Sequence, residues 1–260
     1  MKILLTNDDG IYAPGIFAMA EEISAQPSSE AIVVAPDREQ SATGHAITVH
    51  KPLRVNQVKK LGEMLSIPFY SVNGTPSDCI KLAVEAVMEE KPDLVISGIN
   101  RGANLGTDVL YSGTVSGAME AAILGVKAIA VSLVDYDYED YSVAASYTAK
   151  IANKMFNNPD MFDNNALLNI NVPPGEIGEI QGIKHTRLGF RQYENVFEKR
   201  LDPRGKAYYW MAGKVIEDTT EKGTDVAAVN NAYVSVTPIK YDLTDYSLFH
   251  KLIDSELEFE

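Results

Sequence analysis

Cysteine, tryptophan and long apolar runs are all scarce in this sequence of 260 residues. Cys79 is the single cysteine, which excludes an intrachain disulfide and fits a reducing compartment, so we expect a cytoplasmic protein. No stretch reaches the roughly 20 apolar residues that a membrane helix needs. Lys2 alone precedes the first apolar run, which is not the layout of a signal peptide.

Positive charge is also in short supply. The 23 lysines and arginines stand against 36 aspartates and glutamates, which gives a formal net charge of −13. Binding to a nucleic acid polymer needs basic side chains that face phosphates, so this composition argues against it. A small anionic substrate can still bind where a cation and backbone amides neutralise it locally. We therefore expect a small-molecule substrate, with no nucleic acid polymer and no membrane as partner.

Short apolar runs alternate with helix-like segments through most of the chain, which predicts an α/β fold. Runs rich in Val, Ile and Leu predict strands, and the segments between them predict helices. Thr75 followed by Pro76 is a typical helix start. This alternation predicts right-handed βαβ units and a mostly parallel sheet with helices on both faces. We expect strands at residues 2–6, 31–35, 94–97, 128–133 and 166–172, helices at 15–25, 76–89, 114–125 and 141–156, and an edge hairpin within 44–72.

The composition changes beyond about residue 182, so we divide the chain into a catalytic core, 1–181, and a C-terminal extension, 182–260. Residues 187–214 are polar and aromatic, with a turn at 202–205 and a strand at 208–210. The aromatic side chains of such a hairpin cannot all be buried in their own fold, which indicates an oligomerisation arm that docks on a partner subunit. A strand at 233–238 and a closing helix at 246–253 are expected to complete the extension.

Two adjacent acids, Asp8 and Asp9, directly follow the first predicted strand. Ligands of open α/β sheets bind at the carboxyl ends of strands. Two carboxylates at that place repel each other unless a positive charge lies between them, and a hard divalent cation with oxygen ligands meets this need. The alternative is a solvated pair that caps the next helix.

Three further loops carry residues suited to the same chemistry. Ser41, after the second strand, has a hydroxyl oxygen for a cation, and Asn100, after the third, has a neutral carbonyl oxygen. A helix start near residue 112 offers free amides and hydroxyls that can hold a phosphate. Polar loops and ordinary helix caps remain the alternatives. The metal candidates are thus Asp8, Asp9, Ser41 and Asn100, and the phosphate-side candidates are Asn104, Ser112, Gly113 and Thr114.

His45 lies in the same loop as Ser41, after the second predicted strand. A histidine there could assist a leaving group, but a lone loop histidine more often makes only structural hydrogen bonds. If all four loops follow strands of one sheet, they converge on one edge. The residues then predict one site for a cation and a phosphate, in which the cation and the helix amides offset charge on the phosphoryl oxygens.

The motifs in these loops resemble the SurE family, the stationary-phase survival nucleotidases. The match extends in order over nearly the whole chain. One departure is Asn231, where the family commonly has glycine. The motifs are Asn7-Asp8-Asp9-Gly10, Ala35-Pro36-Asp37-Arg38 with Ser41, Gly74-Thr75-Pro76, Ser97-Gly98-Ile99-Asn100, Asn104-Leu105-Gly106, Tyr111-Ser112-Gly113-Thr114, Asp202-Pro203-Arg204-Gly205, Gly223-Thr224-Asp225 and residues 233–238.

The resemblance implies a Rossmann-like domain with an exchanged C-terminal arm and a homodimer or homotetramer. It implies a 5′- or 3′-nucleotidase that uses Mg²⁺ or Mn²⁺, one ion per subunit, with exopolyphosphatase activity as a further expectation. Matched by position, Asp8, Asp9, Ser41 and Asn100 correspond to the family's metal ligands, with the two acids catalytic. Asn104, Ser112, Gly113 and Thr114 correspond to its phosphate-side residues.

Two other protein classes also place acids after a first strand. A phosphatase of the haloacid dehalogenase type needs them two residues apart, whereas Asp8 and Asp9 are adjacent. A signalling receiver module is about half this length and needs a further aspartate at the end of a middle strand. This chain has Ser97-Gly98 there, which argues against a receiver.

Overall fold

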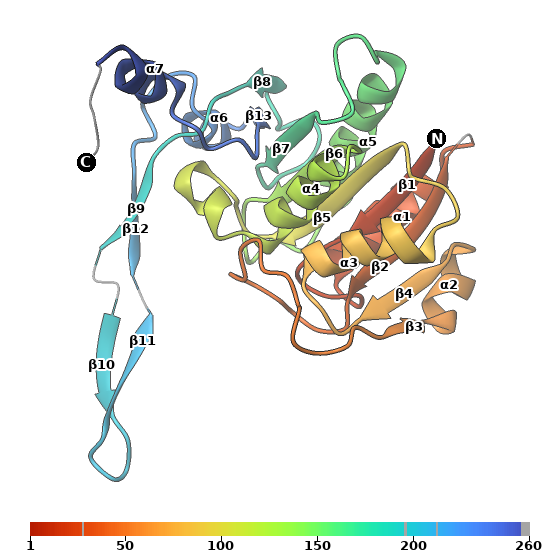
Figure 1. Ribbon diagram of the computed structural model, residues 1–260, viewed down its shortest axis with the longest axis horizontal. Helices are drawn as coiled ribbons and strands as arrows, with labels where there is room; N and C mark the ends of the chain where they lie inside the picture. Colours follow the sequence, from red (N-terminus) through yellow and green to blue (C-terminus); the bar gives the residue numbers. More distant parts are fainter. Residues whose placement is uncertain (28, 195–196, 212, 256–260) are drawn as a thin grey trace.

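A nine-stranded sheet forms the centre of the protein, as seen in the computed structural model (Figure 1), which describes residues 1–27, 29–194, 197–211 and 213–255. The strands lie in the order β3-β4-β2-β1-β5-β6-β7-β13-β8. Five pairings from β4 to β7 are parallel, which confirms a mostly parallel sheet. The strands are β1 (Lys2–Thr6), β2 (Glu30–Pro36), β3 (Val55–Gln57), β4 (Phe69–Val72), β5 (Leu94–Arg101), β6 (Lys127–Leu133), β7 (Leu167–Val172), β8 (Ile183–His185) and β13 (Val234–Ile239).

Helices cover both faces of this sheet, as the sequence predicts. Successive strand residues point to opposite faces, so Ile3 and Leu5 pack in one apolar cluster and Leu4 in another. Helices α1 (Pro14–Ser24) and α5 (Ser142–Asn157) pack in the first cluster. Helices α3 (Pro76–Leu82) and α4 (Gly113–Ile123) pack in the second, which also buries the free Cys79. No helix in the described ranges combines the length and the apolar character needed to cross a membrane.

The first strand occupies the point where the order of the sheet reverses. β1 pairs in parallel with β2 on one side and with β5 on the other. In open α/β sheets this switch point is where ligands bind, at the carboxyl ends of the strands. The acid pair Asp8–Asp9 follows β1 at this point.

The predicted edge hairpin within 44–72 is wrong in its connection. β3 and β4 do pair in antiparallel register, but helix α2 (Lys59–Leu65) joins them in place of a tight turn. The residues of β3 are all exposed and α2 buries none of its own. Leu61 and Leu65 of α2 pack, partly buried, against the core at helical spacing, which is a short signal that the sequence prediction did not use.

The helix that starts after Thr75 is confirmed, with a shorter end than predicted. The Thr75 hydroxyl accepts from the Asp78 amide at 3.1 Å, and the Asp78 carboxylate accepts from the Thr75 amide at 2.9 Å, which forms a capping box. The helix continues as one π-helical turn, η1 (Ala83–Val87), and ends before Met88 rather than at residue 89.

The C-terminal extension contains a long two-stranded arm that reaches away from the sheet (Figure 1). Its base pairs β9 (Arg191–Glu194) with β12 (Lys214–Glu217), and its tip pairs β10 (Phe197–Leu201) with β11 (Ala207–Met211). The predicted turn at 202–205 joins the tip strands, since the Asp202 amide donates to the Lys206 carbonyl. We call residues 191–217 the arm. Its tip exposes Phe197, Leu201, Tyr209, Trp210 and Met211.

Two further elements complete the extension. Helix α6 (Asp225–Asn230) leads into β13, which returns to the sheet antiparallel to β7. Asn231, where the family commonly has glycine, has an ordinary φ of −104°, and the following Ala232 takes the left-handed conformation with φ of 58°. Helix α7 (Tyr246–Asp254) confirms the predicted closing helix, and none of its residues is buried.

Candidate active site

Asp8 lies between the end of β1 and the start of α4. Its carboxylate accepts two hydrogen bonds from Thr114, from the amide at 3.0 Å and from the hydroxyl. Its carbonyl accepts from the Gln40 amide at 2.7 Å, which brings the loop after β2 against it. Asp8 is only 4% exposed, and this burial raises the pKa of its carboxyl while the Thr114 bonds oppose the rise.

Asp9 contacts the end of β5, whereas Asp8 contacts the start of α4. The Asp9 carboxylate accepts from the Arg101 amide at 3.0 Å. Burial, followed by the negative charge of Asp8, raises the pKa of Asp9 to about 6. The Arg101 Nε donates to the Tyr136 carbonyl, and within the described ranges neither acid forms an ion pair with a basic side chain. The pair therefore carries negative charge that a bound cation would neutralise.

The two neutral oxygen candidates lie next to this acid pair, but their side chains differ. Asn100 precedes Arg101, and its side-chain Nδ2 donates to the Gly102 carbonyl at 2.8 Å, which leaves its Oδ1 for a ligand. Ser41 follows Gln40, is exposed, and donates its hydroxyl to Glu39 at 2.7 Å. The Ser41 oxygen can still coordinate a cation, but its hydroxyl donates to Glu39, which is not among the residues predicted for the site.

The donor set fits a hard divalent cation better than a thiophilic one. In the part of the chain that the structure describes, no three His, Cys, Asp or Glu side chains gather as a metal cluster. A metal here would bind two carboxylates together with neutral oxygens, and Mg²⁺ and Mn²⁺ accept such sets. Glu39 adds negative charge nearby, since it raises the pKa of both Asp8 and Asp9.

The start of α4 provides an amide beside the acid pair. Ser112 is an ordinary cap, because its hydroxyl accepts from the Val115 amide at 3.0 Å. The amides of Thr114 and Ser116 are also engaged, with Asp8 and with the Ser112 carbonyl. The Gly113 amide has no partner among the described residues, so this first-turn donor is free for an anion.

Gly113 also allows Asp8 to approach the helix closely. A Cβ atom at this position would lie 2.8 Å from the Asp8 Cβ and 2.9 Å from its Oδ2. The expectation that each of the four loops follows its own strand is wrong for this one. Residues 111–117 are reached from β5 through the 3₁₀ helix η2 (Gly106–Leu110). The segment still meets the acid pair because α4 packs against β5 and β6.

Asn104 is held by residues that the sequence analysis missed. Its amide donates to Asn171 Oδ1 at 2.9 Å, and its carbonyl accepts from the side chains of Asn169 and Asn171 at 2.8 and 3.0 Å. Its own Nδ2 donates to Ser132 Oγ at 2.8 Å, so one N–H of that group remains for a phosphate. These partners are polar residues near the carboxyl ends of the apolar strands β6 and β7, a signal that could have identified them.

His45 lies away from the acid pair and has a structural partner. Its Nε2 is 2.8 Å from Glu120 Oε2, and this bond is the main reason that the pKa of Glu120 is lowered. Lys81 reaches the other oxygen of Glu120 at 3.4 Å. The arrangement joins the second loop to α3 and α4 and favours the structural interpretation of His45.

An open hollow of about 380 Å³ lies beside Asp9. Residues from the loops after β1 and β2, from the end of β5 and from the segment just before α5 line it. The hollow has room for an organic group attached to a phosphate bound near the acids. Its lining includes Tyr12, Arg38, Glu39, Arg101 and Tyr141.

Comparisons with known proteins agree in one assignment. A family model described as survival protein SurE matches residues 3–195. A relative named 5′-nucleotidase SurE, from Natranaerobius thermophilus, is 77% identical over 258 residues, which are 99% of this chain and 100% of the relative. A protein of the same name from Alkaliphilus metalliredigens is 50% identical over 259 residues, with the same coverage. The crystal structure of SurE protein from Aquifex aeolicus matches with a TM-score of 0.84 and 41% identity, covering 99% of this chain and 100% of that one.

Proposed function

This chain belongs to the survival protein SurE family, and on that premise we propose that it is a metal-dependent 5′-nucleotidase. Its substrates would be nucleoside 5′-monophosphates, which it hydrolyses to nucleoside and phosphate. The observation that carries the proposal is the contact between Asp8 and the start of α4. It puts an unneutralised acid pair next to a free helix amide, so that a cation and a phosphate can bind side by side.

The residues present fit a divalent cation. Asp8 and Asp9 would hold it with the oxygens of Asn100 and Ser41, one ion per subunit, and Mg²⁺ and Mn²⁺ both suit this set. When bound, such an ion supplies positive charge that offsets the charge of the phosphoryl oxygens. The same charge would lower the pKa of Asp9 from its metal-free value of about 6.

The chain's own groups would then position and hydrolyse the ester. The Gly113 amide and the remaining N–H of Asn104 donate to phosphoryl oxygens, and the Thr114 hydroxyl keeps the Asp8 carboxylate in place. Water attacks the phosphorus in line and one of the two carboxylates accepts its proton. The phosphorus–oxygen bond to the nucleoside breaks, the leaving oxygen takes up a proton from solvent water to give the free hydroxyl, and the carboxylate returns its proton to solvent.

A substrate and metal panel tests this function. We expect turnover of 5′-AMP and other nucleoside 5′-monophosphates with Mg²⁺ or Mn²⁺, and loss of at least about a hundredfold in rate when a chelator removes the metal. Phosphate release is the measurement, and p-nitrophenyl phosphate is the nonspecific comparison. Full activity in chelator would contradict the metal role, and turnover of p-nitrophenyl phosphate without nucleotides would contradict the substrate class. In the same panel, 3′-monophosphates and polyphosphate test our expectation of 3′-nucleotidase and exopolyphosphatase activity.

We further propose that the arm docks on a second copy of this chain, in a dimer or tetramer in the cytoplasm. The exposed apolar side chains of β10, β11 and α7 support this, because a monomer leaves them in water. Exchange of the arm or of α7 between subunits would bury them. The division of the chain into a 1–181 core and a 182–260 extension is proposed on the same basis.

Trp210→Asp is expected to dissociate the assembly. The side chain is 59% exposed on β11, and a charge there would be buried unpaired in a subunit interface. Light scattering after size exclusion would show a smaller species than the native protein. The matched control is Met161→Asp, an exposed apolar residue outside the arm. An unchanged mass for Trp210→Asp would contradict docking through this face.

A further inference from the structure

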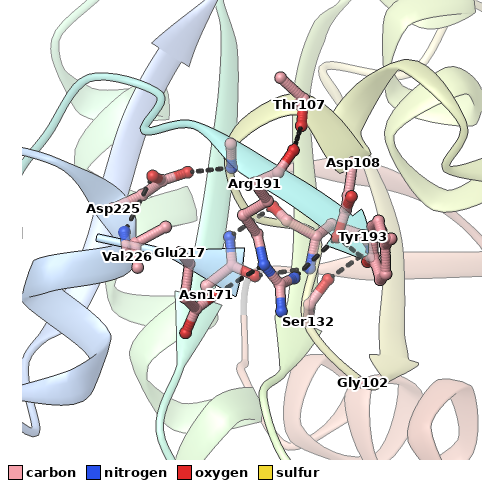
Figure 2. Close-up of polar contacts among 12 residues, drawn as sticks. Gly102, Thr107, Asp108, Ser132, Asn171, Arg191, Tyr193, Glu217, Asp225 and Val226 are labelled. Atoms are coloured by element: carbon pink, nitrogen blue, oxygen red, sulfur yellow. Dashed lines mark hydrogen bonds and ion pairs between the residues drawn. The ribbon is translucent and has the colours of Figure 1, made fainter. Parts of the chain in front are cut away.

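The base of the arm contacts the segment that joins two phosphate-side residues of the site. Residues 104–114 run from Asn104 through η2 to Gly113 and the start of α4. Figure 2 shows Arg191, the first residue of β9, between Asp108 of η2 and Glu217 of β12. Arg191 therefore links the base of the arm to the segment between Asn104 and Gly113.

Arg191 binds this segment with both its side chain and its backbone. Its Nη1 lies 2.7 Å from Asp108 Oδ2, and its carbonyl accepts from the Thr107 hydroxyl at 2.6 Å. Its Nε lies 2.7 Å from Glu217 Oε2, an ion-pair distance, although the N–H is not aligned for a hydrogen bond. The Tyr193 hydroxyl donates to the same Asp108 oxygen at 2.7 Å. We call Asp108, Arg191 and Glu217 the ion triad.

Asp225 makes a second link between the same two segments, two residues before Asp108 on one and two residues before Arg191 on the other. Its carboxylate is fully buried and accepts from the Gly106 amide at 2.8 Å and from the Gly189 amide at 2.7 Å. The two glycines are so close that a Cβ on Gly106 would lie 2.7 Å from the Gly189 carbonyl oxygen. The strand that enters the arm is thereby fixed against the start of η2.

The energetics of the ion triad favour a positioning role over a stabilising one. Its side chains are 13% to 21% exposed, so all three charges lose most of their hydration. Buried ion pairs of this kind add little net stability, because desolvation offsets the attraction. The planar guanidinium does restrict the geometry, because its Nη1 donates to Asp108 while its Nε stays at ion-pair distance from Glu217. The triad therefore sets where η2 lies relative to the base of the arm.

We propose that Arg191 is a positioning residue for phosphate binding. Asn104 is fixed by β6 and β7, and the ion triad fixes η2, so that the short connection from η2 to Gly113 has one path. Without the triad, the Gly113 amide and Asn104 lose their common spacing. Docking of the arm on a second copy would hold the same triad in place, which links assembly to substrate binding. This inference rests on the phosphate site of the proposed function.

Arg191→Met tests the proposal, with Arg200→Met as the matched control on the same arm. Arg200 is exposed, forms an ion pair with Glu198 in its own strand, and interacts with Tyr208 of the paired strand β11. For Arg191→Met we expect the KM for 5′-AMP and the inhibition constant of inorganic phosphate to rise together by about tenfold, with a smaller change in kcat. Hydrogen exchange of amides in residues 104–114 should be faster than in the native protein. Arg200→Met should match the native protein in all three measurements.

Several outcomes would overturn the proposal. Native phosphate affinity together with native exchange in Arg191→Met would do so, and so would equal effects in Arg200→Met. If Arg191→Met does not fold, Asp108→Asn tests the same contact, because it removes the charge that Arg191 binds. Asp108→Asn should weaken phosphate binding in the same way. If the native enzyme hydrolyses no nucleotide, the proposed function fails, while phosphate binding and exchange still decide the role of Arg191.

Discussion

Asp8→Asn should lower kcat for 5′-AMP by on the order of a hundred- to a thousandfold, the effect of removing one preorganised electrostatic group from an active site. The substitution removes one of two charges that would hold the cation. Asparagine can keep both contacts with Thr114, since its oxygen can accept from the Thr114 amide and its nitrogen can donate to the hydroxyl. The melting temperature of the metal-free variant should therefore not fall, because the variant no longer buries a carboxylate at this position and no longer repels the charge of Asp9.

The matched control is Asp160→Asn, which neutralises an exposed acid far along the chain. It should retain native turnover and show the native response to metal. Thermal unfolding with and without Mg²⁺ separates the two roles of Asp8, since the native protein should gain stability from the ion and Asp8→Asn should gain much less. Near-normal 5′-AMP hydrolysis by Asp8→Asn would contradict its assignment to the site.

Gly15→Ala is expected to prevent folding or to reduce the free energy of unfolding by more than about 3 kcal/mol, the upper range for overpacking. Gly15 lies in the first turn of α1, and a Cβ atom there would lie 2.0 Å from the Ile99 carbonyl oxygen. Backbone at this position cannot move without shifting β5, which carries Asn100. Helix propensity alone would favour alanine by about 1 kcal/mol, so the steric term decides the sign.

Gly178→Ala provides the comparison for this second experiment. A Cβ on Gly178 meets no atom within 4 Å and the residue needs no left-handed conformation. The variant should be as stable as the native protein or slightly more so. Denaturant unfolding of both variants is the measurement. Native stability for Gly15→Ala would mean that α1 packs less closely on β5 than described.

Much of the fold follows from local patterns in the sequence. β1 and its neighbours are short apolar runs with turn residues after them, so their type, their parallel pairing and the position of Asp8 and Asp9 could be predicted. The capping box at Thr75 could be predicted because all its atoms come from four consecutive residues. The prediction that failed concerns elements with a weak signal, since β3 has three exposed residues and α2 is seven residues long with Leu61 and Leu65 only partly buried.

The candidate site was predictable in its composition and less so in its contacts. The contact of Thr114 with Asp8 joins residues 106 positions apart, and that of Arg191 with Asp108 joins residues 83 apart. Only the packing of α4 on the sheet and of the arm on η2 creates these pairs. The sequence pattern also does not predict where a hydroxyl points. Ser41, for example, donates its hydroxyl to Glu39. Whether these residues bind metal and phosphate stays a prediction.

The position of the one tryptophan has a consequence for spectroscopy. Trp210 lies on β11, which stands away from the nine-stranded sheet (Figure 1), and the buried tyrosine of the core is Tyr141. Indole emission therefore reports the surroundings of β11, and circular dichroism of the backbone reports mainly the sheet and its helices. Midpoints from the two probes need not coincide on heating. A blue-shifted emission that reddens on dilution, before any loss of ellipticity, would read out separation of subunits rather than a folding intermediate.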